Sequence, residues 1–451
     1  MDVTVIDTSA LGDRSYLVHD GEVALVVDPQ RDIDRVTAAA AQAGVRITHV
    51  AETHIHNDYV TGGLELARAT GAAYLVNAAD PVQFDRTPIS DGESVDVGGL
   101  QVQAVATPGH TETHLSYVVT HEGEQAVFSG GSLLFGSVGR TDLVAAAKTT
   151  ELTHAQYASV RRLVGESQDD AALYPTHGFG SFCSSGPATG AESSTIAEQR
   201  EHNHALTDQD EAHFVEQLIA NLTAYPTYYA HMGPANLKGP QPVDLAVPEP
   251  LDAEELTRRL EQGEWVVDLR ERVAFADGHL SGAVSFEYGD GASFTTFLGW
   301  VLPWNDRITL AGSREQVEAA IRDLSRIGID SPDAALGTDP AQLAPDAATA
   351  SYPRVGWEQL LRDRADDEAV LDVRREDEFA AAHLEGAVNV PLHELLTRMD
   401  EVPAGTVWVH CGSGYRAGVA ASLIQRAGGS PVHVDAGFGD AQDAGLPITQ
   451  G

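Results

Sequence analysis

Short apolar segments separated by turns dominate the first 180 residues. Runs such as Val23 to Val27 and Val102 to Val105 have the length of strands, and apolar side chains at helical spacing intervene from Asp34 to Gln42 and from Gly63 to Thr70. A further helix is expected from Asp208 to Leu222. This alternation of strand and helix patterns predicts a layered α/β architecture.

Prolines and glycines interrupt the pattern near residue 242. Gly239-Pro240-Gln241-Pro242 stops regular structure, so the first domain is expected to span residues 1–242. A second stretch, acidic and rich in alanine with several prolines, runs from Asp333 to Pro353 and is expected to be a linker. The regions beside it are predicted domains, 243–345 and 350–451.

An internal repeat relates these two later regions. The segment from Asp268 to Val284 matches the segment from Asp372 to Val388 at a constant offset of 104 residues. Each copy begins with a helical pattern, Asp252 to Gln262 and Gly356 to Arg364, followed by a short buried strand pattern. A repeat of this length indicates a duplicated domain, here a small doubly wound α/β unit.

Histidines cluster behind one strand pattern of the first domain. The apolar run Ile47 to Ala51 is followed by His54-Ile55-His56-Asn57-Asp58. Imidazole is the usual ligand of zinc and iron, and alternating residues of an extended chain share a face, so His54 and His56 can reach one ion. The later landmarks are Thr107-Pro108-Gly109-His110, Phe128-Ser129-Gly130-Gly131 and Pro175-Thr176-His177. The ordered set predicts a metal site formed by His54, His56 and His110, with Asp58 and His177 as weaker candidates.

The second copy of the repeat carries a cysteine between a strand and a helix. Val407 to His410 precedes Cys411-Gly412-Ser413-Gly414-Tyr415-Arg416, and an apolar helix follows. Backbone N–H groups of the loop and the helix N-terminus place positive potential around the sulfur, which favours a thiolate nucleophile. The alternative is a buried, inert cysteine. The first copy has no cysteine, so it is expected to be a structural or docking domain.

Charge and cysteine content limit the expected binding partners and the expected cellular environment of the protein. The net charge of −39 repels nucleic acid and anionic membrane. It predicts a halophilic protein, the alternative being an ordinary acidic protein from a GC-rich genome. Cys183 and Cys411 are the only cysteines, which predicts a reduced, cytoplasmic protein without a disulfide framework. Neither a signal peptide nor an apolar run of about 20 residues is found, so no membrane association is expected.

The first domain resembles the metallo-β-lactamase fold and, within it, the persulfide dioxygenases. The matching segments are Val27-Asp28-Pro29, Thr53 to Gly63, Thr107 to Thr111, Gly139 to Asp142 and His177-Gly178. The resemblance implies one mononuclear metal ion, iron(II) in preference to zinc, with His54 and His110 as ligands.

Two positions depart from the family pattern. Tyr59 stands where a histidine is expected, and Gly131 stands where an aspartate ligand is expected. Three outcomes are open: His56 completes a three-histidine face, water or Asp58 fills the gap, or the affinity is too low for an ion.

The same resemblance suggests roles for further residues. Tyr59 would donate a hydrogen bond beside the open metal position, and His177 would support a ligand. Arg140 would bind an anionic substrate tail or simply pair with Asp142. Cys183 would lie near the pocket or be a plain buried thiol.

The second copy of the repeat resembles a rhodanese. The matching residues are Asp372, Arg374, His383 to Ala387 and Cys411 to Arg416. The six-residue loop has the length found in the sulfurtransferases of that family. The resemblance implies that Cys411 is the nucleophile, that Arg416 closes the loop, and that the sulfur substrate is bound by Gly412, Ser413, Gly414 and Tyr415.

The domain order resembles the persulfide dioxygenase–sulfurtransferase fusions. It implies an α/β multidomain protein, an αββα metallo-β-lactamase sandwich followed by two doubly wound rhodanese-like domains. The expected function is oxidation of a low-molecular-weight thiol persulfide to sulfite, with Cys411 joining sulfane sulfur to sulfite as thiosulfate. The expected partners are the persulfide, its thiol and sulfite; a homo-oligomer is left open. The alternatives are a metallo-hydrolase of the glyoxalase II or thioesterase type with a rhodanese tail, and a metal-free sulfur carrier.

Overall fold

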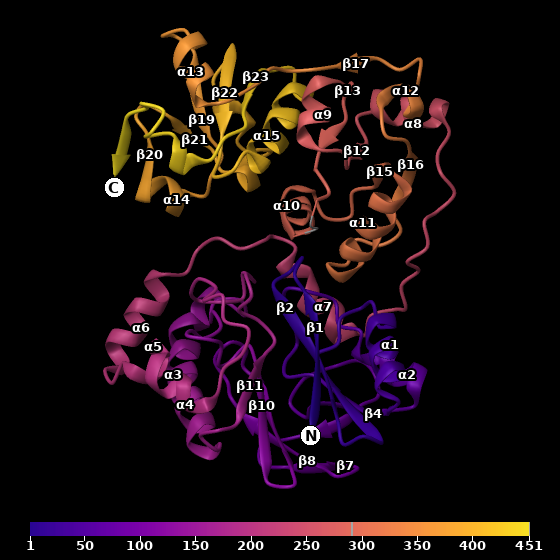
Figure 1. Ribbon diagram of the computed structural model, residues 1–451, viewed down its shortest axis with the longest axis vertical. Coiled ribbons are helices and arrows are strands. Elements are labelled where there is room, and N and C mark those ends of the chain that lie inside the picture. The colour runs from indigo at the N-terminus through magenta and orange to yellow at the C-terminus, as the bar shows by residue number, and fades with distance from the viewer. Residues whose placement is uncertain (290–291, 451) are drawn as a thin grey trace. The chain divides into compact units, whose positions relative to one another are not determined.

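The chain folds as two compact units in the computed structural model, which describes residues 1–289 and 292–450 (Figure 1). Unit 1 comprises Met1–Val243 and Ser325–Gly328, and unit 2 comprises Asp244–Leu324 and Ile329–Gly451. The division after Val243 lies next to the boundary expected at residue 242. Unit 2 is not divided further, so its separation into two domains near residues 345–350 stays a prediction.

Two sheets form the centre of unit 1. The six-stranded sheet has the order β1-β2-β3-β4-β5-β6, and the five-stranded sheet has the order β11-β10-β9-β8-β7. The strands are β1 Asp2–Thr8, β2 Asp13–His19, β3 Val23–Val27, β4 Arg46–Ala51, β5 Ala73–Asn77, β6 Thr87–Ile89, β7 Ser94–Val97, β8 Leu100–Ala106, β9 Leu115–His121, β10 Glu124–Gly130 and β11 Ala172–Pro175. The helices are α1 Asp34–Ala43, α2 Gly63–Thr70, η1 Ala146–Lys148, α3 Thr149–Glu166, α4 Ile196–His202, α5 His204–Thr207, α6 Glu211–Ala220 and α7 Tyr229–Lys238.

Alternating side chains on the strands create four layers. Val27 of β3 and Phe128 of β10 belong to the apolar core between the two sheets. Val26, which precedes Val27 on β3, lies on the opposite face of the sheet and packs in the core that includes α1 and α2. On β10, Val127 likewise points away from the centre and shares a core with Leu163 of α3. Because neighbouring residues of a strand face opposite sides, both sheets are buried on both faces. The αββα sandwich is therefore confirmed.

Strand ends bring the expected metal-binding segments to one region. Strands β3, β4 and β5 run parallel, and His54 follows the end of β4. In the other sheet β10 and β11 are parallel; Gly131 follows the end of β10, and His177 follows the end of β11. His110 lies in the loop after β8. Four loops from two sheets thus carry the candidate site.

Unit 2 contains two parallel sheets with matching strand order. The first has the order β14-β12-β15-β16, and the second has the order β21-β19-β22-β23 with β18 added beside β23. Their strands are β12 Trp265–Asp268, β14 Val284–Ser285, β15 Ile308–Gly312, β16 Asp333–Leu336, β18 Arg354–Val355, β19 Ala369–Asp372, β21 Val388–Asn389, β22 Thr406–His410 and β23 Ser430–Val434. Two small antiparallel pairs are β13 His279–Leu280 with β17 Thr349–Ala350, and β20 Ala382–Leu384 with β24 Ile448–Gln450.

Helices connect these strands. They are α8 Ala253–Glu261, α9 Arg272–Asp277, α10 Ala292–Val301, α11 Arg314–Arg326, α12 Pro340–Leu343, α13 Trp357–Asp363, α14 Glu376–Ala381, η2 Leu392–Glu394, η3 Met399–Glu401, α15 Tyr415–Arg426 and η4 Phe438–Asp440. The expected linker from Asp333 to Pro353 is therefore wrong. Ala334 and Ala335 belong to β16, Pro340 and Ala341 to α12, and Ala350 to β17, and β16 pairs with β15 inside the sheet. No helix within residues 1–289 and 292–450 has the length and apolar character needed to cross a membrane.

Repeated residues make the same contacts in both copies. Arg270 Nη2 donates to Asp268 Oδ2 at 2.7 Å, and Arg374 Nη2 donates to Asp372 Oδ2 at 2.6 Å. Each copy also has a histidine stacked on the phenylalanine four residues before it. The ring centroids of Phe275 and His279 are 3.8 Å apart, and those of Phe379 and His383 are 3.9 Å apart. The 104-residue offset thus relates positions that have the same structural role.

Candidate active sites

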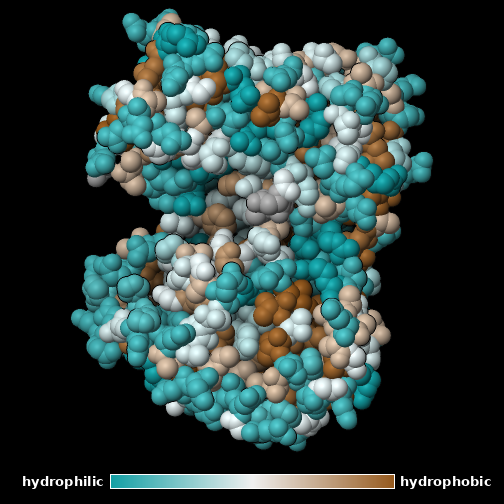
Figure 2. Space-filling model, in the orientation of Figure 1, coloured by the Kyte–Doolittle hydropathy of each residue, from teal (hydrophilic) through white to brown (hydrophobic). Residues whose placement is uncertain are grey.

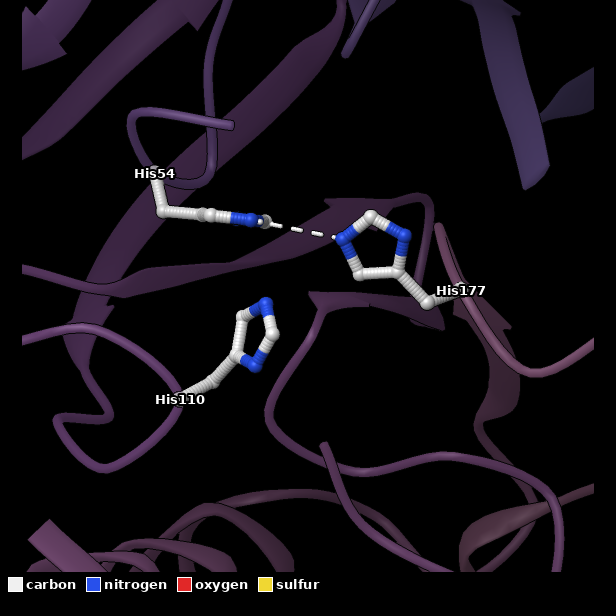
Figure 3. A group of neighbouring side chains, drawn as sticks. All are labelled: His54, His110 and His177. Atoms are coloured by element: carbon white, nitrogen blue, oxygen red, sulfur yellow. Dashed lines mark hydrogen bonds between the residues drawn. The ribbon is translucent and has the colours of Figure 1, made fainter. Parts of the chain in front are cut away.

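Buried imidazoles converge in unit 1. Figure 3 shows the rings of His54, His110 and His177 turned toward a common space, and one ligand atom from each lies within 4.8 Å of the others. The Nε2 atoms of His54 and His177 are 3.3 Å apart. The structure therefore brings two of the predicted ligands together with His177, the weaker candidate.

One ring nitrogen of each of these histidines is already held by the protein. His110 Nδ1 donates to the carbonyl of Arg140 at 2.7 Å, which leaves its buried Nε2 without a hydrogen-bond partner among the described residues. His177 Nδ1 lies 2.8 Å from Asp13 Oδ1 and 3.1 Å from Asp58 Oδ2. Metal-binding histidines are typically held in this way, because the anchored nitrogen orients the ring and fixes its tautomer.

His56 is placed differently from its two predicted partners. Its Nε2 lies 3.3 Å from both Asp28 Oδ1 and Glu52 Oε2 and 3.0 Å from the hydroxyl of Tyr59, while its Nδ1 is buried without a hydrogen-bond partner in the described chain. His56 forms a neighbouring group of potential ligands with Asp58 and His177. Which of these histidines would hold an ion stays a prediction.

Tyr59 packs behind His56. The two rings stack with centroids 4.3 Å apart, and the tyrosine hydroxyl donates to the backbone carbonyl of Asp28 at 3.3 Å. Burial raises the pKa of Tyr59 well above its ordinary value, so it remains a neutral phenol. This geometry gives Tyr59 a contact with a histidine; its predicted role beside an open metal position stays a prediction.

Electrostatics divides the imidazoles into two kinds. Burial lowers the pKa of His110 to about 3, and burial together with the neighbouring His56 lowers the pKa of His54 well below its ordinary value. Both rings are therefore neutral, which is the form that binds a metal. Burial also lowers the pKa of His56, but the charge of Asp28 outweighs it and raises this pKa to about 9. For His177 the carboxylates of Asp58 and Asp13 likewise overcome burial and raise the pKa.

The His110 ring occupies the space that a side chain at position 131 would need, so glycine fits there and an aspartate does not. A Cβ placed on Gly131 would lie 2.7 Å from His110 Nε2 and even closer to the ring carbon Cδ2. The imidazole thus takes the space in which an aspartate side chain would start. Together with the unpartnered Nε2 of His110, this packing fits an ion held mainly by imidazole nitrogens.

Sequence reasoning missed two acidic neighbours of this cluster, Asp13 and Glu52, and gave the neighbouring His114 no role in the site. Asp13 and Glu52 hold His177 and His56, and His114 accepts the N–H of Gly131 at 3.0 Å. A signal for Glu52 existed in the sequence, because residues 52, 54 and 56 would share a face if the segment after β4 were extended. Asp13 is separated from its histidine by most of the domain, and no spacing signals it.

Arg140 is held by an ion pair and hydrogen bonds within the protein, and Cys183 is buried. The Arg140 guanidinium binds both carboxylate oxygens of Asp142, at 2.7 and 2.8 Å, and also donates to the carbonyls of Phe182 and Thr223. Of the two roles considered for Arg140, the structure shows pairing with Asp142. Cys183 is fully buried, and burial raises its pKa well above the ordinary value, as expected for an unreactive thiol.

The Cys411 loop lies between β22 and α15. Cys411 is buried, and its Sγ accepts the N–H of Gly414 at 3.1 Å. Gly414 has φ +93°, and a Cβ there would collide with the carboxylate of Asp435, so this position requires glycine. The loop therefore directs a backbone donor at the sulfur, as the sequence predicted.

Arg416 closes the loop through an ion pair. Its two terminal nitrogens bind the two carboxylate oxygens of Glu378 at 2.6 and 2.8 Å. Burial favours the neutral acid, but the hydrogen bonds and charge of Arg416 outweigh it and lower the pKa of Glu378. Substrate contacts of Gly412, Ser413, Gly414 and Tyr415 stay predictions.

The first copy of the repeat has glycine in place of the cysteine. Sheet register pairs Asp268 with Ala311 in the first copy and Asp372 with His410 in the second, which makes Gly312 the counterpart of Cys411. A Cβ on Gly312 would lie 3.1 Å from Gln316 Oε1 and 3.1 Å from Leu269 Cβ. Side chains therefore fill this loop, and the first copy has no thiol there.

Comparisons with known proteins agree with this division of the chain. A family model described as the metallo-beta-lactamase superfamily matches residues 11–177, and one described as a rhodanese-like domain matches residues 357–443, in the second copy of the repeat. The mitochondrial persulfide dioxygenase ETHE1 of Homo sapiens is 29% identical over 243 residues, which cover 53% of this chain and 81% of that protein.

Two further similarities extend the comparison. A hydroxyacylglutathione hydrolase of Acidiphilium cryptum (strain JF-5) is 34% identical over 140 residues, which cover 30% of this chain and 56% of that protein. The crystal structure of a metallo-beta-lactamase from Staphylococcus aureus superposes with a TM-score of 0.66 at 25% identity, covering 75% of this chain and 99% of that one.

Proposed function

We propose that this protein oxidises a low-molecular-weight thiol persulfide and transfers sulfane sulfur through Cys411. The chain joins a metallo-β-lactamase domain to a C-terminal rhodanese-like domain. The persulfide dioxygenase homologues and the rhodanese-like domain support a role in sulfur metabolism. The observation that carries the proposal is that one chain holds both a buried imidazole with an unpartnered Nε2, His110, and a cysteine whose sulfur accepts a backbone N–H.

The fold and the homologues imply a bound metal, and the buried histidines and acids of unit 1 are able to hold one. We assign His54, His110 and His177 as its ligands, with His56 and Asp58 as the neighbouring alternatives, and we favour iron(II) over zinc. When bound, iron(II) supplies the oxygen chemistry of persulfide oxidation. The protein contributes a buried pocket and the neutral imidazoles of His54 and His110, while Asp13 and Asp58 orient His177.

The overall oxidation consumes one persulfide, one O₂ and one water, and it releases one thiol, one sulfite and two protons. In the transfer step the Cys411 thiolate attacks the outer sulfur of a persulfide; the S–S bond of the donor breaks, and the thiol leaves with a proton. Sulfite then attacks the outer sulfur of the Cys411 persulfide, thiosulfate leaves, and the thiolate is restored. The N–H of Gly414 stabilises the negative sulfur in both states. No external oxidant is needed for this transfer.

Anaerobic iron reconstitution followed by elemental analysis tests the metal assignment. We expect close to one equivalent of metal and, with glutathione persulfide, oxygen uptake that matches sulfite release. Iron and zinc both far below one equivalent would instead favour a metal-free sulfur carrier. Because both cysteines are free in the structure, we propose a reducing, cytoplasmic setting for this chemistry.

Similarity to hydroxyacylglutathione hydrolase favours a second candidate, a thioester hydrolase. Hydrolases of this fold generally use a fuller set of metal ligands than this chain provides, and here the Tyr59 hydroxyl contacts His56 and the carbonyl of Asp28. Cleavage of a glutathione thioester by zinc-loaded protein, without oxygen uptake on persulfide, would establish this alternative.

Replacement of Cys411 by serine separates the two activities. We expect Cys411→Ser to abolish thiosulfate formation from persulfide and sulfite under anaerobic conditions, because serine cannot carry the sulfane sulfur, while oxygen uptake is retained. Cys183→Ser is the matched control and should keep the transfer. Parallel loss of both activities in Cys411→Ser would contradict two independent sites.

A further inference from the structure

We infer that Phe297, on α10 of the first repeat copy, is a specificity-determining residue for the Cys411 site of the second copy, and that it favours sulfur donors with an organic body. The inference rests on the proposed sulfur transfer by Cys411. Under this inference the first repeat copy, which has no cysteine, contributes a residue to the sulfurtransferase site of the second copy. It follows from three observations: how α15 is held, where α10 lies, and how charge is distributed at the loop.

Helix α15, which begins inside the Cys411 loop, packs on the first copy. Near its N-terminus the Tyr415 hydroxyl donates to the backbone carbonyl of Glu287 at 3.2 Å. Further along, the Ser422 hydroxyl oxygen accepts the N–H of Ser285 at 3.0 Å. The first copy therefore contacts α15 both at the loop and along the helix, so the loop and the first copy form one packed structure.

Helix α10 places aromatic rings beside the loop residues. The ring centroids of Phe297 and Tyr415 are 6.0 Å apart, and the guanidinium carbon of Arg416 lies 5.8 Å from the centroid of Phe297. At this distance a guanidinium is attracted to the face of an aromatic ring. One turn further along α10, Trp300 stacks on His393 of η2 with centroids 4.4 Å apart. Aromatic surface from the first copy thus borders the last two residues of the cysteine loop.

Charge at this border is largely neutralised. Both terminal nitrogens of Arg416 bind Glu378, and Arg375 binds both oxygens of Asp377 at 2.9 Å. The loop residues from Gly412 to Tyr415 are uncharged. A small dianion such as thiosulfate therefore finds little net positive charge beyond the backbone donors. A donor with an organic body gains contact with the Phe297 ring, so the site should prefer an organic persulfide.

Steady-state transfer to cyanide, measured as thiocyanate, tests this inference with two donors, glutathione persulfide and thiosulfate. We expect Phe297→Ala to raise KM for glutathione persulfide by about fivefold to tenfold, the effect of losing one aromatic contact, and to change KM for thiosulfate by less than about twofold. The kcat values should stay close to wild type. Phe297→Leu, which keeps an apolar side chain, should recover part of the loss.

Leu361→Ala is the matched control, because Leu361 is an exposed apolar residue of the same unit, 46% accessible. It should change neither KM. The ratio of the two KM values within one variant does not depend on the fraction of active protein, so partial unfolding cannot imitate the result, and Phe297→Leu supplies the same ratio if Phe297→Ala does not fold. An unchanged ratio in the Phe297 variants would overturn the inference. Absence of transfer from either donor in the wild type would instead refute the proposed function.

Discussion

Gly131 and His110 are coupled at the level of single atoms. The His110 ring cannot swing away freely, because its Nδ1 donates to the carbonyl of Arg140 at 2.7 Å. On the other side of the ring, a side chain at position 131 would collide with it. A glycine at position 131 therefore allows the His110 imidazole to reach its place. The close packing of this ring occupies the space that a carboxylate at position 131 would need.

The cost of disturbing this packing can be measured. We expect Gly131→Ala to lower the free energy of unfolding by about 1–3 kcal/mol, as overpacking in a rigid core does. It should also weaken metal binding, because His110 must move. Denaturant unfolding of the metal-free protein and a metal titration give the two quantities. Gly165→Ala, near the end of α3, is the control: a Cβ there meets nothing within 4 Å and alanine favours the helix, so the substitution should be neutral or stabilising by up to about 1 kcal/mol. Equal effects at both positions would contradict the packing argument.

Acid should weaken the ion pair between Glu378 and Arg416, which closes the cysteine loop, within a defined pH range. The pKa of Glu378 in the folded protein is lowered from its ordinary value of 4.5, because the hydrogen bonds and charge of Arg416 overcome burial. A lowered folded-state pKa gives a stabilisation that is complete above the ordinary value and is lost as the pH falls through the lowered one.

Thermal unfolding of wild type and Glu378→Gln across pH tests this sign. The difference in midpoint between the two proteins should be constant above about pH 5 and shrink below about pH 4. The oxygen uptake proposed for unit 1, which does not contain this pair, serves as the internal control at neutral pH. A difference in midpoint that is the same at neutral and strongly acidic pH would be incompatible with the ion pair.

At the scale of elements, the junction of β22 and α15 shapes the sulfur site. Cys411 follows a buried parallel strand, and α15 starts at Tyr415, so the loop between them must turn sharply. Gly414 makes this turn with a positive φ, and Asp435, just beyond β23, fills the space beside it. The neighbouring strand thus limits which residue the loop accepts.

Two glycines that flank α15 separate the effect of backbone strain from the effect of lack of space. Gly414→Ala should reduce sulfur transfer at least about tenfold, since moving the Gly414 N–H away from Cys411 Sγ removes a charge-assisted hydrogen bond. Gly428, past the other end of the helix, has almost the same φ, +90°, but a Cβ added there would meet nothing within 4 Å. Gly428→Ala should therefore cost stability, about 1 kcal/mol, and leave the transfer rate unchanged. Equal loss of transfer in both variants would show that the Asp435 contact is irrelevant.

At the scale of the whole molecule, charge dominates the surface. The chain carries 67 acidic residues against 28 lysines and arginines. Hydrophilic side chains cover most of the face shown in Figure 2, and the exposed large apolar residues of the described chain are few: Val5, Val144, Leu361, Val388 and Leu396. Such a surface keeps the protein dispersed but makes its compact state repel itself.

Salt should relieve this repulsion. Raising KCl from about 0.1 M to about 1 M shortens the Debye length from about 10 Å to about 3 Å, so we expect the thermal unfolding midpoint to rise steeply over this range. Sucrose at matched osmolality, which does not screen charge, is the control and should have a much smaller effect. A midpoint that stays level or falls with KCl would contradict the halophilic interpretation.

Local pattern determined much of this protein. Strand and helix periodicities predicted a layered α/β architecture, because burial on alternate or 3.6-spaced positions depends on neighbours in the sequence. The αββα order of the layers was implied by the resemblance to the metallo-β-lactamase fold, and the 104-residue repeat predicted the duplicated α/β unit. The Cys411 loop was also predictable, since a strand, a tight glycine-containing turn and a helix follow one another within a few residues. The missing cysteine of the first copy required only the residue types.

Tertiary structure alone decided how the distant side chains meet. His54 and His177 face each other across 123 residues of sequence, and Asp13 reaches His177 across 164. His54 and His56 were expected to share one ion because they alternate, yet Asp28 and Glu52 lie beside the Nε2 of His56. Spacing along a strand determines which face a ring occupies, whereas the charges and packing that other segments bring to that face determine where its nitrogens point.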